Sequence, residues 1–130
     1  MQFGYTIIYV ADVAATLDFY VNAFGFAQRF LHESGQYGEL ETGSTTLSFA
    51  AHETAGGNLP DGYQAMSAEG KPFGIEIGFL TDDVPAAVTR AVQTGAVLVT
   101  APKTKPWGQI VAYVRAPEGT LIEICTPVGG

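Results

Sequence analysis

The stretch DVAATLDFYVNAFG (residues 12–25) decides the fold, because its pattern recurs in DVPAAVTRAVQTG (residues 83–95). In the first stretch, apolar residues recur at intervals of three and four, which is the spacing of one helix face. In the second, apolar or small residues stand at the same offsets. Residues suited to begin or end a helix also match: Asp12 and Gly25 in the first stretch, and Asp83, Pro85 and Gly95 in the second. The sequence therefore predicts two copies of one helix.

Each predicted helix has one predicted strand before it and three after it. Segments rich in Tyr, Ile, Val and Thr alternate with turn residues such as Ser34-Gly35 and Gly43-Ser44. The predicted strands cover residues 3–10, 27–31, 37–41 and 45–51 in the first half, and 73–80, 97–100, 110–115 and 120–126 in the second. Both halves, residues 1–52 and 73–130, are therefore predicted to be βαβββ units within one compact domain.

Residues 53–72 connect the two halves and are rich in Gly and Pro, which predicts a long loop. A loop of this length inside a compact domain is either functional or mobile. The side chains of Tyr63 and Met66 favour a lid over a pocket, and a plain tether between the halves is the alternative.

The composition is that of a folded, acidic protein. The chain has 130 residues, of which 13 are acidic and 6 basic, giving a net charge of −7, and 47% are hydrophobic. The acidic balance argues against nucleic acid or an anionic membrane as a partner, and no apolar run approaches the roughly 20 residues of a membrane span. No signal peptide is recognisable, so we expect a cytoplasmic protein. The single cysteine, Cys125, excludes an internal disulfide and is interpreted as a buried, inert thiol.

Short motifs around the repeat point to a family. In the first half these are Tyr9-Val10-Ala11-Asp12, Asp18-Phe19-Tyr20 and Phe24-Gly25-Phe26, and in the second Pro106-Trp107-Gly108 and Ala116-Pro117-Glu118-Gly119-Thr120-Leu121-Ile122-Glu123. With the two βαβββ units, they resemble the vicinal oxygen chelate superfamily, which includes glyoxalase I, bleomycin-resistance proteins and extradiol dioxygenases. The resemblance implies an α+β fold of two tandem βαβββ modules, with curved mixed sheets around a cleft and helices on the outside. It also implies a homodimer.

Metal-dependent members of this superfamily place ligands on the first and last strands of a module, mostly His or Gln on the first strand and Glu on the last. The resemblance puts these positions at Tyr5 and Ser48 in the first module, and at Glu76 and Glu123 in the second. Only Glu123 has the expected ligand type, and Zn²⁺, Ni²⁺ and Fe²⁺ prefer imidazole. We therefore expect the usual metal chemistry to be absent, with Glu76 and Glu123 as candidate ligands if Mg²⁺ or Mn²⁺ binds.

Glu76 and Glu123 each stand between two isoleucines, in Ile75-Glu76-Ile77 and Ile122-Glu123-Ile124. In a strand, the isoleucines face one way and the glutamate the other. Both glutamates could simply face solvent, but the resemblance directs them into the cleft. Two carboxylates close together can share a proton, hold a hard cation such as Mg²⁺, Mn²⁺ or Ca²⁺, or receive a cationic ligand.

Three further residues of the second half are candidate ligand contacts. Trp107 could line the mouth of the cleft or pack a loop. Tyr113 and Arg115 share one strand face, and Arg115 could bind an anionic group of a ligand or form a surface ion pair. His32 and His52 lack a second His or Cys at ligand spacing and are interpreted as ordinary exposed histidines.

These observations predict a small-molecule binding protein of the bleomycin-resistance type, with an aromatic, acidic cleft. Its predicted ligand-binding residues are Tyr5, Ser48, Trp107, Tyr113 and Arg115. The alternative is a divalent-metal-dependent lyase or dioxygenase of the glyoxalase type that uses Glu76 and Glu123. A metal-free enzyme with this pair as general acid and base, and a structural or regulatory dimer, are further possibilities.

Overall fold

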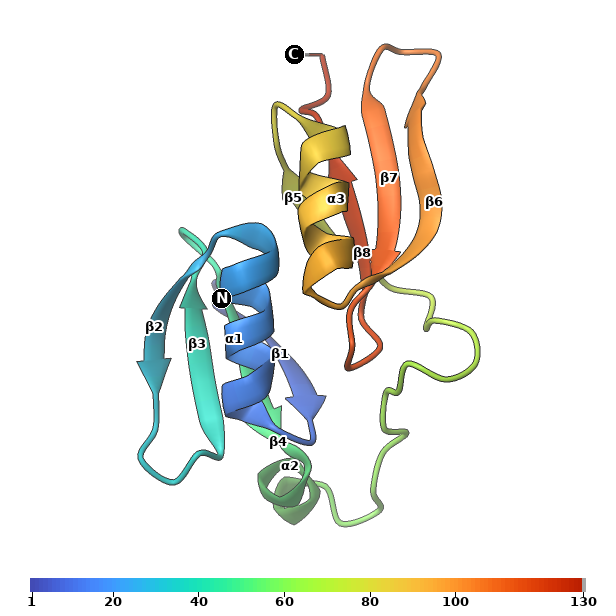
Figure 1. Cartoon of the computed structure of the whole chain (residues 1–130). Helices are drawn as coiled ribbons and strands as arrows, with labels where there is room; N and C mark the ends of the chain where they lie inside the picture. The colour runs from blue at the N-terminus through green and yellow to red at the C-terminus, as the bar shows by residue number, and fades with distance from the viewer. Residues whose placement is uncertain (130) are drawn as a thin grey trace. The chain divides into compact units, whose positions relative to one another are not determined.

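The computed structural model describes residues 1–129 and divides into two compact units, Met1–Met66 and Ser67–Gly130 (Figure 1). We call these units the first and second modules. Each contains one four-stranded mixed sheet. Among the helices of the described residues, none has the length and apolar character needed to cross a bilayer.

The first module follows the predicted order of strand, helix and three strands, with one more helix at its end. Its elements are β1 (Tyr5–Val10), α1 (Val13–Phe24), β2 (Ala27–Leu31), β3 (Tyr37–Glu41), β4 (Thr46–Ala51) and α2 (His52–Asn58). The strands lie in the order β1-β4-β3-β2. The β1–β4 pair is parallel, whereas the β3–β4 and β2–β3 pairs are antiparallel.

The second module repeats this topology. Its elements are β5 (Ile77–Leu80), α3 (Val84–Thr94), β6 (Val97–Thr104), β7 (Ile110–Arg115) and β8 (Leu121–Cys125). The strands lie in the order β5-β8-β7-β6, again with the first and last strands of the module paired in parallel. The two tandem βαβββ modules and the α+β class predicted from the internal repeat are thus confirmed.

Matching caps begin both repeated helices. The Asp12 carboxylate accepts a hydrogen bond of 3.0 Å from the Ala15 amide, and the Asp83 carboxylate accepts one of 3.1 Å from the Ala86 amide. Each bond satisfies an amide that has no partner within the helix. At the end of α1, Gly25 has a φ of 80°, a left-handed conformation that glycine adopts without steric cost.

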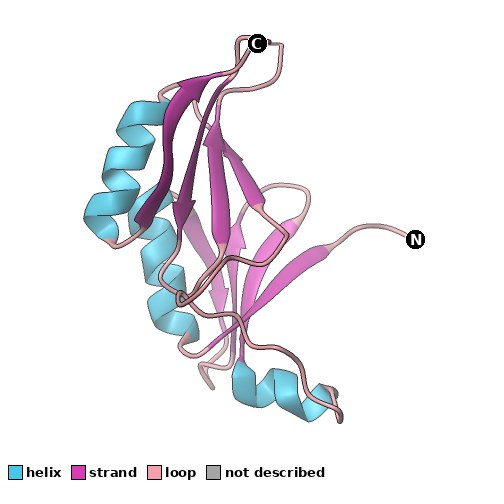
Figure 2. Ribbon diagram, turned by 90° about the vertical axis from the view of Figure 1, so that its right-hand side faces the viewer, coloured by secondary structure: helices cyan, strands magenta, loops and turns pink. Residues whose placement is uncertain are grey.

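Each long helix packs on one face of its own sheet, as Figure 2 shows. In the second module, Val84 and Val88 of α3 are buried, as are Ile122 and Ile124 of β8. Because successive side chains in a strand point to opposite faces, Glu123 points away from the face that buries these isoleucines. The helix packing therefore decides which polar side chains gather on the opposite face of the sheet.

Three local expectations are corrected by the structure. The segment predicted as a loop begins with α2, which buries Ala55 despite the neighbouring glycines. β6 continues to Thr104, past Pro102, because it is an edge strand whose register shifts between Thr100 and Lys103. An edge strand with a bulge tolerates the missing N–H of proline. β5 begins at Ile77, so Glu76 immediately precedes the strand instead of lying within it.

Tyr63, one of the two residues predicted to belong to a lid, packs on the first module. Its ring stacks on that of His52, with centroids 5.8 Å apart, and meets the edge of Tyr9. Its hydroxyl also forms a hydrogen bond with Nδ1 of His52. His52, interpreted from the sequence as an ordinary exposed histidine, is thus half-buried and fixes part of the connecting segment.

Candidate functional site

The strand register of the second module brings together several of the predicted site residues. Glu123 on β8 lies opposite Gly78 of β5 on one side and opposite Tyr113 of β7 on the other. All three residues lie on the sheet face opposite α3, together with Cys125 two positions after Glu123. Glu76 leads into β5 two residues before Gly78, next to this row.

Glu123 is the centre of this cluster. The Tyr113 hydroxyl donates a hydrogen bond of 3.0 Å to Glu123 Oε1, and the Cys125 thiol donates one of 3.5 Å to Oε2. Both carboxylate oxygens of the half-buried Glu123 therefore already accept a hydrogen bond from the protein. Such bonds orient the carboxylate before any ligand arrives.

Burial and the negative charges of Glu76 and Glu123 raise several pKa values in this cluster. Partial burial of the Glu76 carboxyl raises its pKa, and the negative charge of Glu123 raises it further. Burial, the hydrogen bond to Glu123 and the negative charges nearby raise the pKa of Tyr113 to about 12. Burial and then Glu123 raise the pKa of the Cys125 thiol. Tyr113 and Cys125 therefore stay protonated at neutral pH, which suits donors and does not suit a thiolate nucleophile.

No basic side chain neutralises the two carboxylates. Within residues 1–129, neither Glu76 nor Glu123 forms an ion pair with Lys or Arg. A glycine also leaves one side of Glu123 uncovered, because a Cβ atom added at Gly78 would lie 3.6 Å from Glu123 Oε2. That distance is an ordinary van der Waals contact, so an alanine here would cover part of the carboxylate without a clash.

Trp107 lies in the hairpin between β6 and β7 and is 61% exposed. Its indole N–H donates a hydrogen bond of 2.9 Å to the side-chain oxygen of Gln109. The amide nitrogen of Gln109 in turn donates to the Thr126 carbonyl. The ring is thus held in place and open to solvent, and it does not plug the interior of the module.

The surroundings of Arg115 differ from both possibilities considered from the sequence, which were an anionic group of a ligand and a surface ion pair. It is 8% exposed, and its guanidinium donates to the carbonyl oxygens of Gly119, Gly70 and Ser67 at 2.6, 3.1 and 2.9 Å. These partners are backbone atoms of the second module. The structure therefore engages Arg115 in holding loops instead of leaving it exposed in a surface ion pair.

The first module has different residues at the matching positions. Its register places Ser48 opposite Ile7 and Glu39, so Ser48 corresponds to Glu123. Ser48 is fully buried, and its hydroxyl donates to the Thr6 carbonyl at 3.4 Å. Tyr5, which corresponds to Glu76, is exposed and lies near enough to Tyr37 to contribute to its raised pKa. The predicted pair Tyr5 and Ser48 thus lies around Tyr37.

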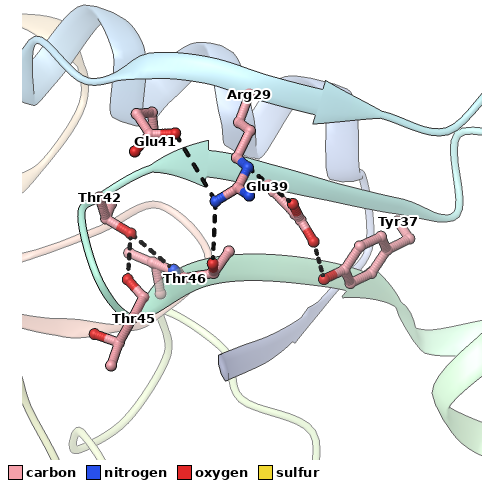
Figure 3. Close-up of polar contacts among 8 residues, drawn as sticks. Arg29, Tyr37, Glu39, Glu41, Thr42, Thr45 and Thr46 are labelled. Atoms are coloured by element: carbon pink, nitrogen blue, oxygen red, sulfur yellow. Dashed lines mark hydrogen bonds and ion pairs between the residues drawn. The ribbon is translucent and has the colours of Figure 1, made fainter. Parts of the chain in front are cut away.

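Sequence reasoning missed a polar network on this module, which Figure 3 shows. The Tyr37 hydroxyl donates to Glu39 Oε2 at 2.8 Å, and Arg29 Nε lies 3.7 Å from Glu39 Oε1. Arg29 Nη1 lies 3.8 Å from Glu41 Oε2 and donates to the Thr46 hydroxyl at 3.5 Å. Burial is the main cause of the raised pKa of Tyr37. The alternation of Tyr37, Glu39 and Glu41 along one strand was the available signal.

The donor set does not fit the divalent metal that the fold family implies. The matching positions of the first module supply a tyrosine and a buried serine hydroxyl, which are poor ligands for Zn²⁺, Ni²⁺ or Fe²⁺. Among residues 1–129, no group of three or more His, Cys, Asp or Glu side chains is arranged to hold a metal ion. In the second module, Glu76 and Glu123 are only two carboxylates, fewer than the ligands that a divalent cation takes.

The family follows from a match to the whole repeat. Residues 2–124 match the family model of the Glyoxalase/Bleomycin resistance protein/Dioxygenase superfamily. The chain belongs to this superfamily. Among curated proteins, no sequence matches the chain significantly.

Solved structures support the same fold. A glyoxalase-related enzyme from Fulvimarina pelagi superposes with a TM-score of 0.84 at 18% identity, covering 98% of this chain and 88% of that one. A glyoxalase/bleomycin resistance protein/dioxygenase family enzyme from Burkholderia phytofirmans PsJN gives a TM-score of 0.78 at 24% identity, covering 97% and 98%. TioX from Micromonospora sp. ML1 gives 0.70 at 22% identity, also covering 97% and 98%. At these identities the likeness establishes the fold alone.

Proposed function

We propose that this protein binds a small molecule that carries a positive charge, on the face of the second module opposite α3. One observation carries the proposal: Glu76 and Glu123 lie close enough for the charge of one to raise the pKa of the other, and neither forms an ion pair with Lys or Arg in the described residues. A bound cation would relieve this repulsion, so its binding is favoured by the state of the free site.

Each nearby residue has a role in this proposal. Glu123 accepts the positive group of the ligand at Oε2, while the Tyr113 hydroxyl holds the carboxylate in place through Oε1. Glu76 supplies the second negative charge. The exposed, fixed ring of Trp107 supplies aromatic surface for the rest of the ligand. The net charge of −7 attracts cations toward the protein over a longer range.

We propose binding without metal chemistry, by a cytoplasmic homodimer. The unsuitable donor set described above supports the first part, and the resemblance to the superfamily supports the second. Tyr5 and Ser48 of the first module remain proposed ligand contacts, although the burial of Ser48 leaves Tyr5 as the more accessible of the two.

The alternative is a lyase or dioxygenase of the glyoxalase type that depends on a divalent metal. Two interacting carboxylates are the observation in its favour, since hard cations such as Mg²⁺ and Mn²⁺ prefer oxygen ligands. Under this alternative, Glu76 and Glu123 are metal ligands and not contacts of an organic cation.

Calorimetric titration with metal-free bleomycin, a basic glycopeptide, tests the first proposal. We expect binding to the wild type and a loss of about tenfold or more in affinity in Glu76→Gln and Glu123→Gln, since bonds to charged groups contribute about 1.5–3 kcal/mol. Glu33→Gln, a change at an exposed turn, is the matched control and should bind like the wild type. Binding unaffected by the two site variants would contradict the assigned site.

Elemental analysis and thermal-shift measurements with Mg²⁺ and Mn²⁺ separate the two functions. Stoichiometric metal in the purified protein, or a stabilisation by metal that both site variants abolish, would overturn the metal-free proposal. No response to either metal, together with binding of the glycopeptide, would reject the lyase alternative.

A further inference from the structure

Arg115 is a buried cation whose hydrogen bonds all go to backbone carbonyls of loops. It ends β7, and its three bonds reach Gly119, in the turn before β8, and Ser67 and Gly70, at the start of the second module. A guanidinium suits this task because its donors point in several fixed directions in one plane. Lysine carries its donors on a single nitrogen and cannot reproduce this planar arrangement of donors.

The segment that Arg115 holds is the one that carries Glu76. Residues 67–76 contain no helix or strand, and nearly all of them are exposed. Few contacts of other kinds are therefore available to fix this segment, and bonds to a charged donor are stronger than neutral ones. Glu76 is the last residue of the segment before β5.

We propose that Arg115 is a positioning residue, which fixes residues 67–76 on the second module and thereby sets the place of Glu76 beside Glu123. The inference deepens the proposed site, and it rests on the proposed function only for its consequence on ligand binding. It assigns to Arg115 a role different from the direct ligand contact that the sequence suggested.

The proposed effect of Arg115 on Glu76 is mechanical, and an electrostatic effect is the alternative that the test must separate from it. The groups that shift the pKa of Glu76 are its own partial burial and Glu123, while Tyr113 and Cys125 respond to the same two carboxylates. The two kinds of effect have opposite signs. Loss of a nearby positive charge would raise the pKa of Glu76, whereas release of its segment would hydrate the carboxyl, take it away from Glu123 and lower its pKa.

The test compares Arg115→Met and Arg115→Lys with the wild type in the absence of any ligand. Hydrogen exchange measures the protection of residues 67–76, and carbon NMR of the side-chain carboxyls measures the pKa of Glu76, identified by its absence in Glu76→Gln. We expect faster exchange in the segment and a lower pKa of Glu76 in both variants. Arg29→Met removes an arginine from the first module and should change neither quantity.

Several outcomes would overturn the inference. Unchanged exchange in residues 67–76, or faster exchange with an unchanged pKa of Glu76, would show that Arg115 does not position this carboxyl. A raised pKa in Arg115→Met with a normal one in Arg115→Lys would show an electrostatic effect. If Arg115→Met does not fold, Arg115→Lys alone decides between these results. Neither readout needs a ligand, so failure of the wild type to bind the glycopeptide would reject the proposed function and leave this inference standing.

Discussion

The two modules have the same strand order and the same helix caps, but they place different chemistry at matching positions. At the centre of each sheet, on the face opposite its long helix, the first module has buried Ser48 and the second has Glu123. On the neighbouring strand the order is reversed. The residue opposite Ser48 is the acidic Glu39 on β3, whereas the residue opposite Glu123 is the uncharged Tyr113 on β7. The core residues and the helix caps determine the fold, whereas the strand residues that face away from the long helix differ between the two modules.

The difference extends to charge. In the first module, Glu39 has an arginine partner and accepts a hydrogen bond from a tyrosine. In the second, Glu123 has a tyrosine and a thiol as donors, and its charged neighbour is another glutamate. The glutamates on the first sheet face thus share one arginine, whereas those on the second have no basic partner in the described residues. This contrast is why we place the binding of a cation on the second module.

Exchanging the central residues Ser48 and Glu123 between the modules should give the largest effect on stability. We expect a much larger loss in the first module than in the second. Ser48→Glu puts a carboxylate at a fully buried position beside Glu39, so we expect the free energy of unfolding to fall by about 3 kcal/mol or more. Glu123→Ser should fold normally, because it removes repulsion with Glu76. Urea denaturation followed by circular dichroism measures both. Equal losses of stability would mean that the two faces are not as different as their burial indicates.

Filling the gap beside Glu123 should have an intermediate effect, on binding and not on folding. Gly78→Ala adds a methyl group 3.6 Å from Glu123 Oε2, which makes this position more like Ile7 of the first module. We expect roughly a tenfold loss of affinity for the basic glycopeptide, about 1.4 kcal/mol. Stability should rise slightly, because alanine loses less conformational freedom than glycine.

Gly74→Ala is the matched control for this change, since a Cβ atom there would meet nothing within 4 Å. It should leave affinity unchanged. A similar affinity in all three proteins would place the ligand elsewhere than at the open side of Glu123.

The smallest expected effects are on stability, and they have opposite signs in the two modules. The pKa of Glu76 in the folded protein is raised above its ordinary value of 4.5, so protonated Glu76 favours folding. That contribution is complete below about pH 4.5, and it is lost as the pH rises through the raised pKa. Glu76→Gln should therefore raise the melting temperature slightly at pH 7 and leave it unchanged at pH 4.

Glu39→Gln should instead lower stability at pH 7, by up to about 1 kcal/mol, because it removes the ion pair with Arg29. Thermal unfolding of both variants at the two pH values measures the contrast. A destabilised Glu76→Gln at pH 7 would mean that the acidic pair does not repel in the folded protein.

The sequence was sufficient for the fold because the fold depends on regular patterns. Helical spacing, two capping aspartates and eight short apolar segments carried the prediction, and Asp12 and Asp83 then gave the correspondence between modules. Elements without such a pattern were missed or cut short. α2 contains two glycines and forms where Ala55 packs, and β6 passes Pro102 because an edge strand does not need every amide.

The site was predictable only in part, for a related reason. Strand alternation separated Glu123 from its neighbouring isoleucines and placed Tyr113 with Arg115, but only the strand register shows that Tyr113 contacts Glu123. The partners of Arg115 are backbone carbonyls, which every residue has, so no pattern of side chains could identify them. Likewise, the contacts of Arg29 with Glu39 and Glu41 join β2 to β3, and the periodicity of a single strand does not reveal which residues of two strands lie together.

The irregular β6 strand also affects how the protein behaves at high concentration. β6 is an edge strand, and the side chains of Val97, Leu98 and Val99 are exposed on it. A long, regular and apolar edge would recruit a strand from another molecule and begin aggregation. Pro102 removes one amide donor, and the two register shifts disturb the spacing of the others. We therefore expect the same irregularity that hid half of this strand from sequence analysis to reduce aggregation through this edge.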